Sequence, residues 1–320
     1  MKTKTDTSII RRDGAISLSF AEKEQICESN FYAGGPFWHL YTDGRMMQDI
    51  FLSEDDFKAG MAVLAVTICL FSEVKVVTFE IMTNHLHIIT AGEKQKCLLM
   101  FDTFKDKLKR VFAKSERAID WNAFQAEILP IEDLKALRNE IIYVNRNAFV
   151  ANPQYTPYNY PWGGGCAYFN PMIHRLPTTR LDSLTYDMKR KLTHSRDISG
   201  AERLEFTEDI VHIPSFCEIR LGESMFADAR SYFHLLTRNA EAFSQIASRL
   251  KDQIFLTDEE LYLVAIKYAQ SEFGVRQMNL LDPDQKIRIA KELHFRYNAS
   301  NQQLRRLLRL DISILNELFP

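Results

Sequence analysis

Two histidines separated by a single residue lie within an apolar run of the sequence. His85 and His87 flank Leu86 in the segment MTNHLHII. Alternate side chains of a β-strand share a face, so a strand here would turn both imidazoles to one side and Leu86 to the other. Two neighbouring imidazoles supply half of the ligands that a divalent metal ion needs. A polar surface or a hydrogen-bonded pair in the core is the alternative, and the triplet by itself leaves it open.

A tyrosine and an asparagine later in the chain add groups for chemistry on a phosphodiester. Tyr143 and Asn147 lie at i and i+4 on a predicted helix, so they share one face. The apolar stripe of this helix occupies another side, at Leu134, Leu137, Ile141, Val144 and Ala148. A phenol kept off the core can attack phosphorus, with help from a cation or base because its ordinary pKa is about 10. The alternative is an amphipathic tyrosine that packs against a loop.

Together these groups predict a metal-assisted reaction. If the sheet face with the histidines packs beside the tyrosine helix, His85, His87 and Asn147 would hold Mg²⁺ or Mn²⁺ and leave positions open for a phosphate. The ion would stabilise charge on the phosphodiester oxygens while Tyr143 forms a phosphotyrosine. A zinc hydrolase has less support, because no third His, Cys or Glu follows at the usual ligand spacing.

The elements that must position these residues follow from periodicity and turn residues. We predict the order β-α-β-β-α-β-α, at residues 37–42, 53–71, 74–81, 85–90, 95–115, 123–131 and 132–149. This order predicts an α+β fold with a ferredoxin-like (split βαβ) antiparallel sheet, which carries helices on one face and leaves the other partly free. His39, on the first strand, is expected in the core.

The chain divides by composition into four regions. Residues 1–35 are predicted to be an N-terminal arm, 36–150 the candidate catalytic domain, 151–221 an aromatic loop and basic connector, and 222–320 a mostly α-helical C-terminal region. The aromatic loop either stacks on unpaired bases or packs back onto the domain. Helices are expected at 224–249, 257–273, 284–297, 301–309 and 312–319. The last three fit a helix-turn-helix at 284–319 or a plain helical cap.

The composition is that of a globular protein, with 46% hydrophobic and 26% charged residues among 320 and a formal net charge of -2. Because the chain is not globally basic, nucleic-acid binding would have to use local patches. The candidates are Lys105, Lys109, Arg110, Lys189, Arg190, Lys191, Arg305, Arg306 and Arg309. The cysteines form no CxxC pair, and neither a signal peptide nor a membrane span is evident. We therefore expect a cytoplasmic protein with no membrane partner.

Several segments resemble one protein family. MTNHLHIIT resembles the HUH motif of single-tyrosine insertion-sequence transposases. IIYVNRNAFVANP with YPWGGG resembles the tyrosine region of their relatives, the REP-associated tyrosine transposases (the RayT-like branch). FWHLYTDG resembles their first strand, so the resemblance covers about residues 36–170. Asn147 stands where some branches have Gln, and the chain is longer and more neutral than a minimal transposase.

The resemblance implies an HUH nuclease core that nicks and joins single-stranded DNA near hairpins. His85 and His87 would bind the metal with help from Asn147, and Tyr143 would form a 5′-phosphotyrosine and free a 3′-OH. The protein would be bacterial, and nucleoid-associated when bound to DNA. A domesticated DNA-binding protein without catalysis and a metal hydrolase with no nucleic-acid role are the alternatives. A monomer is favoured over a homodimer, because the chain carries a large appendage of its own.

Overall fold

The core of the protein is a four-stranded antiparallel sheet with three helices. The computed structural model describes residues 18–44, 47–113, 115, 117–151, 155–156, 159–238, 240–250 and 256–319. The strands are β1 (Phe37–Thr42), β2 (Lys75–Ile81), β3 (Leu86–Ala91) and β4 (Ala126–Ile131), side by side in the order β2-β3-β1-β4. The helices are α2 (Glu54–Leu70), α3 (Lys94–Phe112) and α4 (Leu134–Ala151). The fold is therefore α+β, and the order β-α-β-β-α-β-α expected from the sequence is confirmed.

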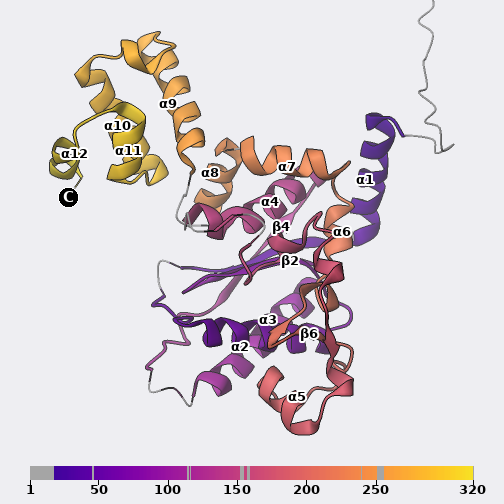
Figure 1. Cartoon of the computed structure of the whole chain (residues 1–320). Coiled ribbons are helices and arrows are strands. Elements are labelled where there is room, and N and C mark those ends of the chain that lie inside the picture. Colours follow the sequence, from indigo (N-terminus) through magenta and orange to yellow (C-terminus); the bar gives the residue numbers. More distant parts are fainter. Residues whose placement is uncertain are drawn as a thin grey trace, which may run out of the picture.

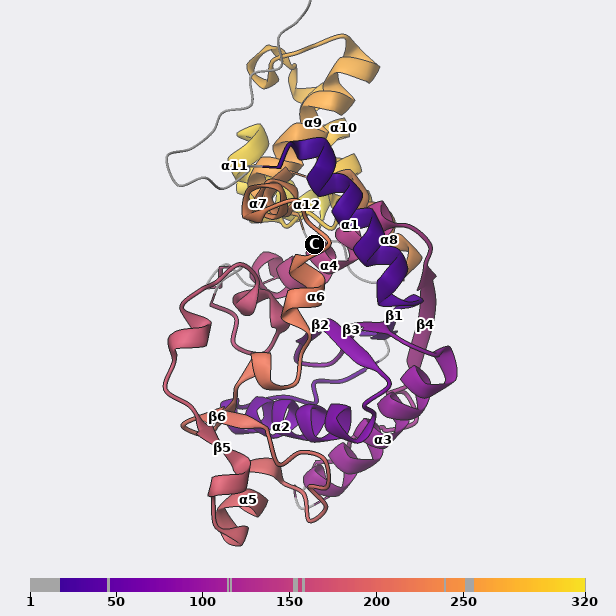
Figure 2. The ribbon, with the colours of Figure 1, turned by 90° about the vertical axis from the view of Figure 1, so that its right-hand side faces the viewer.

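Helices cover both faces of this sheet. α2 and α3 lie against one face and α4 against the other, as Figures 1 and 2 show. The expectation that the second face is partly free is wrong, because every residue of β3 is buried. Ile141 and Val144 of α4 are themselves fully buried, so this helix seals the face rather than bordering it.

The N-terminal region contains a helix where the sequence analysis expected an arm. Residues 1–17 lie outside the described residues, but α1 (Phe20–Gly34) is helical. Ser19 begins it with a capping box. Only Cys27 and Phe31 of this helix are buried, and the polar composition of the segment concealed so narrow an apolar stripe.

The aromatic loop after α4 packs back onto the core. Trp162 is 6% exposed, and its ring stacks on Phe57 of α2 with the centroids 5.2 Å apart. The backbone N–H of Ile81 donates to the Trp162 carbonyl at 2.9 Å, and Tyr168 is fully buried. The rings of Trp162 and Tyr168 are therefore structural and do not serve as stacking surfaces for bases.

Consecutive glycines let this loop approach both β2 and α4. A Cβ on Gly164, at the start of the short helix η1 (Gly164–Ala167), would lie 2.6 Å from Thr78 Oγ1. A Cβ on Gly165 would lie 2.8 Å from the backbone carbonyl oxygen of Asn145. Glycine avoids both clashes. The loop thereby covers the outer edge of β2, next to the histidine strand.

Small elements connect the core to the C-terminal helices. α5 (Tyr186–Thr193) contacts α2, and α6 (Ile219–Glu223) contacts β2. A second antiparallel sheet consists of β5 (Thr179–Arg180), β6 (Glu205–Thr207) and β7 (Ile210–Val211). Single-turn helices lie at η2 (Ile173–Arg175), η3 (Leu181–Ser183) and η4 (Ile213–Ser215).

The C-terminal helices form two groups. α7 (Ala229–Arg238) and α8 (Ala240–Arg249) contact α4 and belong to the main core. A second apolar core is formed by α9 (Asp258–Phe273), η5 (Met278–Leu280), α10 (Pro283–Tyr297), α11 (Asn301–Leu308) and α12 (Ile312–Leu318). This second group projects from the rest of the protein in Figure 1.

The expected C-terminal helices are largely confirmed. The last three agree with the expected ranges to within two residues at each end. The range 224–249, expected as one helix, contains two, α7 and α8. The first begins later than expected, because Asp228 accepts a hydrogen bond from the Ser231 backbone N–H at 2.9 Å and starts α7 there.

Candidate active site

A row of polar residues crosses the sheet on the face covered by α4. Directly paired residues of neighbouring strands share a face, and the pairing places Glu80, His87, Tyr41 and Glu127 in one row from β2 to β4. The first three are 2% exposed or less. A buried polar side chain is costly unless it is hydrogen-bonded, so this row depends on partners from the sheet and from α4.

His39 joins His87 to a carboxylate on α4. His39 Nδ1 lies 2.8 Å from Glu140 Oε2, and His39 Nε2 lies 3.1 Å from His87 Nδ1. A carboxylate accepts, so His39 Nδ1 donates to it. In a neutral imidazole, His39 Nε2 then accepts from the N–H at His87 Nδ1. All three side chains are buried. The chain Glu140–His39–His87 therefore places the lone pair of His87 on Nε2.

Asn84 orients the other histidine by the same principle. Its amide nitrogen donates to the carbonyl oxygens of Gly44 and Met47 at 2.6 and 3.2 Å, so its amide oxygen is the atom that faces His85. His85 Nδ1 lies 2.7 Å from that oxygen and donates to it. The lone pair of His85 is therefore also on Nε2, which is buried.

The two histidines fit a divalent metal ion as neighbouring ligands. Their ring centroids are 5.1 Å apart, and the rings are perpendicular at 89°. Both have Nδ1 engaged by a hydrogen-bond partner, as is usual for imidazoles that bind a metal ion through Nε2. No cluster of three or more His, Cys, Asp or Glu side chains that could hold a metal occurs among the described residues. Two imidazoles suit an ion that takes its other ligands from amide, water or phosphate oxygens.

α4 brings Tyr143 to these histidines. Its ring centroid lies 5.6 Å from that of His87 and 6.3 Å from that of His39. Tyr143 is only 5% exposed, so the expectation that it lies off the buried side of its helix is wrong. The reason is that α4 is enclosed by β2 and β3 as well as by α7 and α8. Asn147 is buried one turn later, and none of the described contacts joins it to either histidine.

A second tyrosine lies at the same histidine. Tyr41 stacks on His87, with the centroids 6.4 Å apart and an interplanar angle of 18°. Its hydroxyl donates to Glu127 at 2.6 Å. Burial, together with this carboxylate, raises the pKa of the Tyr41 phenol well above its ordinary value. Tyr41 therefore keeps its proton, which disfavours it as a nucleophile.

Two ion pairs tie α4 to the helices that follow. Arg249 of α8 contacts Glu140, the carboxylate that holds His39. Arg146 makes two hydrogen bonds to Glu260 of α9, at 2.6 and 2.5 Å, and both side chains are buried. Tyr143 lies between these two attachment points in the α4 sequence.

The predicted DNA contacts on α3 and α5 differ in what they touch. Lys105 is 7% exposed and burial lowers its pKa, so its assignment as a DNA contact is wrong. Lys109 forms an ion pair with Asp106 at 3.5 Å, and Lys189 donates to the Asp182 carbonyl at 3.2 Å. The remaining three, Arg110, Arg190 and Lys191, line one cleft.

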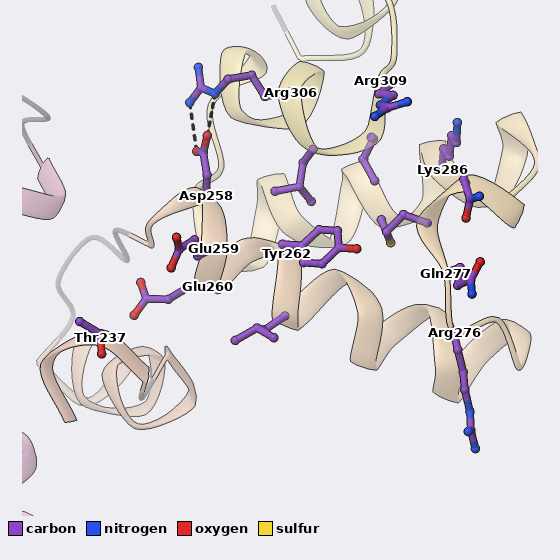
Figure 3. A pocket seen from close by; sticks show the side chains of 15 residues that line it. Thr237, Asp258, Glu259, Glu260, Tyr262, Arg276, Gln277, Lys286, Arg306 and Arg309 are labelled. Carbon is purple, nitrogen blue, oxygen red and sulfur yellow. Dashed lines mark hydrogen bonds and ion pairs between the residues drawn. The ribbon is translucent and has the colours of Figure 1, made fainter. Parts of the chain in front are cut away.

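Two of the three predicted C-terminal arginines, Arg306 and Arg309, line a groove of 1230 Å³ at α9 and α11. Arg306 makes two hydrogen bonds to Asp258, at 2.6 and 3.0 Å, and these lower the pKa of that carboxyl. Figure 3 shows this pair at one end of the groove, with Lys286 and Arg309 toward the other. Arg305 is exposed outside the groove lining. The groove therefore carries both signs of charge.

Comparison with known proteins identifies no relative of this chain. No protein-family model, no curated protein and no solved structure matches it. In the described part of the chain, no helix is both long enough and apolar enough to span a membrane.

Sequence reasoning missed two members of the site, His39 as a partner of His87 and Glu140. These two residues are separated by 101 positions in the chain, so no local spacing links them. The sequence carries a weak indication of their burial, because each is a polar residue on the same face as buried apolar residues. Glu140 follows Leu137 and precedes Ile141 on the packed side of α4.

Proposed function

We propose that this protein is a tyrosine-dependent, metal-assisted nuclease and strand transferase that acts on single-stranded or hairpin DNA. In this proposal the sheet with α2, α3 and α4 is a ferredoxin-like core of the HUH type, and the chain is a REP-associated tyrosine transposase. The observation that carries the proposal is the meeting of Tyr143 and His87, whose ring centroids are 5.6 Å apart. The two rings come from separate segments of the chain, the strand β3 and the helix α4.

The residues of the site have different roles in this proposal. His85 and His87 would hold Mn²⁺ or Mg²⁺ through Nε2, with Asn147 as a further oxygen donor. When bound, the ion would stabilise the charge that develops on the phosphodiester oxygens. Glu140 and His39 keep His87 in the tautomer that coordinates. Asn84 does the same for His85.

Tyr143 supplies the covalent step. Its phenol oxygen would bond to phosphorus as the bond between phosphorus and the 3′ oxygen breaks. The phenol loses its proton, and the departing oxygen gains one, which gives a 5′-phosphotyrosine and a free 3′-OH. Because one phosphodiester replaces another, the reverse step rejoins DNA without an external energy source.

The test is a covalent adduct. Wild-type protein, Tyr143→Phe and Tyr41→Phe are incubated with labelled single-stranded and hairpin DNAs and Mn²⁺, and products are separated on a denaturing gel. Tyr41→Phe is the matched control, because it removes a hydroxyl from the other buried phenol that contacts His87. We expect a protein–DNA band for wild type and Tyr41→Phe but none for Tyr143→Phe.

Other outcomes point elsewhere. An adduct that survives in Tyr143→Phe and is lost in Tyr41→Phe would reassign the nucleophile. Metal-dependent cleavage without any adduct, unchanged in Tyr143→Phe, would favour a metal hydrolase.

A second candidate function is a domesticated DNA-binding protein without catalysis. The observation in its favour is the burial of Tyr143, which at 5% exposure is enclosed by its own fold. Tight, salt-sensitive DNA binding that needs no metal, with no adduct on any substrate, would support this alternative.

A further inference from the structure

A cleft distinct from the tyrosine site gathers basic side chains from two distant segments. It has a volume of 720 Å³ and lies between α3 and α5 with the loop that follows, with Val63 and Val66 of α2 in its wall. We call it the α3–α5 cleft. Its cationic side chains are Lys107, Arg110, Arg190, Lys191 and Arg196.

These five cations lack carboxylate partners within the described structure. None of them comes within 4.0 Å of a described Asp or Glu oxygen. Some arginines elsewhere in the described structure are paired, since Arg117, Arg138 and Arg306 each contact a carboxylate at 2.6 to 2.9 Å. The α3–α5 cleft thus concentrates positive charge that can attract an anion from outside the chain.

The two carboxylates that line the cleft, Asp187 and Asp197, offset only part of the charge of the five cations. Asp197 accepts hydrogen bonds within its own turn, from the Ser199 backbone N–H at 3.1 Å, and these lower its pKa. Asp187 is exposed on the first turn of α5. Burial lowers the pKa of Lys107, the Asp197 carboxylate acts against this lowering, and the nearby Arg110 adds to it.

The number of cations in the α3–α5 cleft, and their spread over several elements, indicate the kind of anion that it binds. One phosphate is satisfied by one or two cationic side chains, whereas five spread over α3, α5 and a loop match a polymer with successive charges. An exposed ring stands beside them, because Tyr186 is 60% exposed and lies 5.7 Å from the Arg190 guanidinium. Aromatic rings next to arginines are typical of surfaces that bind unpaired bases and their backbone.

We propose that the α3–α5 cleft binds the sugar–phosphate backbone of a DNA strand, as a second contact outside the tyrosine site. α5 lies beyond α2, on the opposite side of the sheet from α4, as Figure 1 shows. A strand held in the cleft therefore reaches Tyr143 only by passing around the edge of the core. The identity of the polymer as DNA rests on the proposed function. The observation that five cations without carboxylate ion pairs line the cleft is independent of that function.

This placement separates affinity from chemistry. Weakening the cleft raises the DNA concentration needed for half-maximal adduct formation on long substrates. It leaves the maximal rate unchanged, because no cleft residue touches the site of Tyr143.

The experiment measures binding of a fluorescein-labelled oligothymidylate of about 30 nucleotides to the full chain by anisotropy. EDTA is present, and NaCl is varied from about 50 to 200 mM. The test variant is Arg110→Ala/Arg190→Ala/Lys191→Ala. We expect at least ~10-fold weaker binding at low salt, and a slope of log affinity against log salt that is smaller by about 2.

The matched control removes the same amount of charge elsewhere. Lys75→Ala/Lys94→Ala/Lys135→Ala changes three exposed lysines outside the cleft and should bind like wild type. Circular dichroism of all proteins verifies folding. Arg190→Lys, which keeps the charge, should retain most of the affinity.

Each outcome bears on the proposal. Equal binding by the test variant and wild type would overturn it, as would equal weakening by the control. Polyglutamate that competes as well as oligothymidylate would show that the cleft takes acidic polypeptides instead. Failure of the wild type to bind at low salt would overturn both this proposal and the DNA substrate. If wild type forms the covalent adduct but the cleft variant binds DNA as tightly as wild type, the proposed nuclease stands and the cleft proposal fails. If the cleft variant binds more weakly but no protein forms an adduct, the cleft proposal stands and the proposed nuclease fails.

Discussion

The two faces of the central sheet are equally buried but chemically opposite. Toward α2 and α3, strand pairing puts Phe79, Ile88 and Leu40 in one row, each no more than 1% exposed. Toward α4, the adjacent row contains Glu80 and His87, which are 2% and 0% exposed. Burial of one large apolar side chain stabilises the fold by roughly 1.5–3 kcal/mol, whereas a buried polar group costs free energy unless it is bonded.

This difference separates what makes the fold from what makes the site. The apolar face needs only alternation of residue types along each strand. The polar face needs individual hydrogen bonds between residues far apart in the chain, such as His39 with Glu140 and with His87. Substitutions on the two faces should therefore fail in different ways.

The largest effect is expected on the apolar face. Ile88→Asn leaves a cavity and an unbonded amide, and should lower the free energy of unfolding by about 3–5 kcal/mol. His87→Asn, at the adjacent position of the same strand, should cost only about 1–3 kcal/mol while abolishing Mn²⁺ binding. Urea unfolding of both variants measures the difference. Equal destabilisation would remove the distinction between the faces.

A smaller effect should come from breaking the polar network at one end. Glu140→Leu deprives buried His39 of its acceptor and Arg249 of its partner, and should cost about 2–3 kcal/mol. His39→Phe in the same protein should recover about 1–2 kcal/mol, because the orphaned donor is gone. Unfolding of the two single variants and the double variant gives the coupling. Additive losses would mean that the bond between the two residues contributes nothing.

The next effect concerns the metal rather than the fold. Asn84→Ala frees the His85 ring and should weaken Mn²⁺ binding by about 10–100-fold. Asn145→Ala is the control, since this buried asparagine bonds to Thr78 and Tyr232 instead of a histidine. Titration with Mn²⁺, followed by electron paramagnetic resonance without DNA, measures both. Equal affinity for all proteins would contradict a histidine site oriented by Asn84.

The smallest effect is a pH dependence on the polar face. Because the pKa of Tyr41 is raised in the fold, the unfolded chain loses this proton first, near pH 10. The stability that Tyr41 contributes is therefore complete below about pH 10 and declines above it. The difference in unfolding free energy between wild type and Tyr41→Phe should shrink by about 0.5–1 kcal/mol from pH 8 to pH 10.5. A constant difference would mean that Tyr41 titrates normally.

Much of the fold was predictable from local patterns. The helix expected at 53–71 is observed at Glu54–Leu70, because Ser53 and Asp56 form the capping box that its sequence suggests. Each of the last three helices likewise begins next to a capping Asp or Ser. α1 escaped prediction, since only Cys27 and Phe31 mark its buried side.

The site was predictable only in part. The strand motif and the helix motif indicated His87 and Tyr143, but the separation of 48 positions between His39 and His87 concealed their hydrogen bond. The sequence also indicates that Lys105 is buried. This residue is four positions after Phe101 and three before Leu108, so helical geometry places it on the buried side of α3. A count of positive charge along a helix does not show this.

The ion pairs on α4 make the tyrosine helix responsive to events outside the sheet. Arg146 joins it to Glu260 at the N-terminal end of α9, the first helix of the C-terminal group. A ligand that binds that group and shifts α9 must also change the free energy of the position that Tyr143 occupies. Linkage is reciprocal, so under the proposed function a substrate held at Tyr143 would alter the affinity of the C-terminal group for that ligand by the same factor. If the proposed function holds, the C-terminal group and the tyrosine site are therefore coupled through the Arg146–Glu260 ion pair, together with the contacts between α8 and α9.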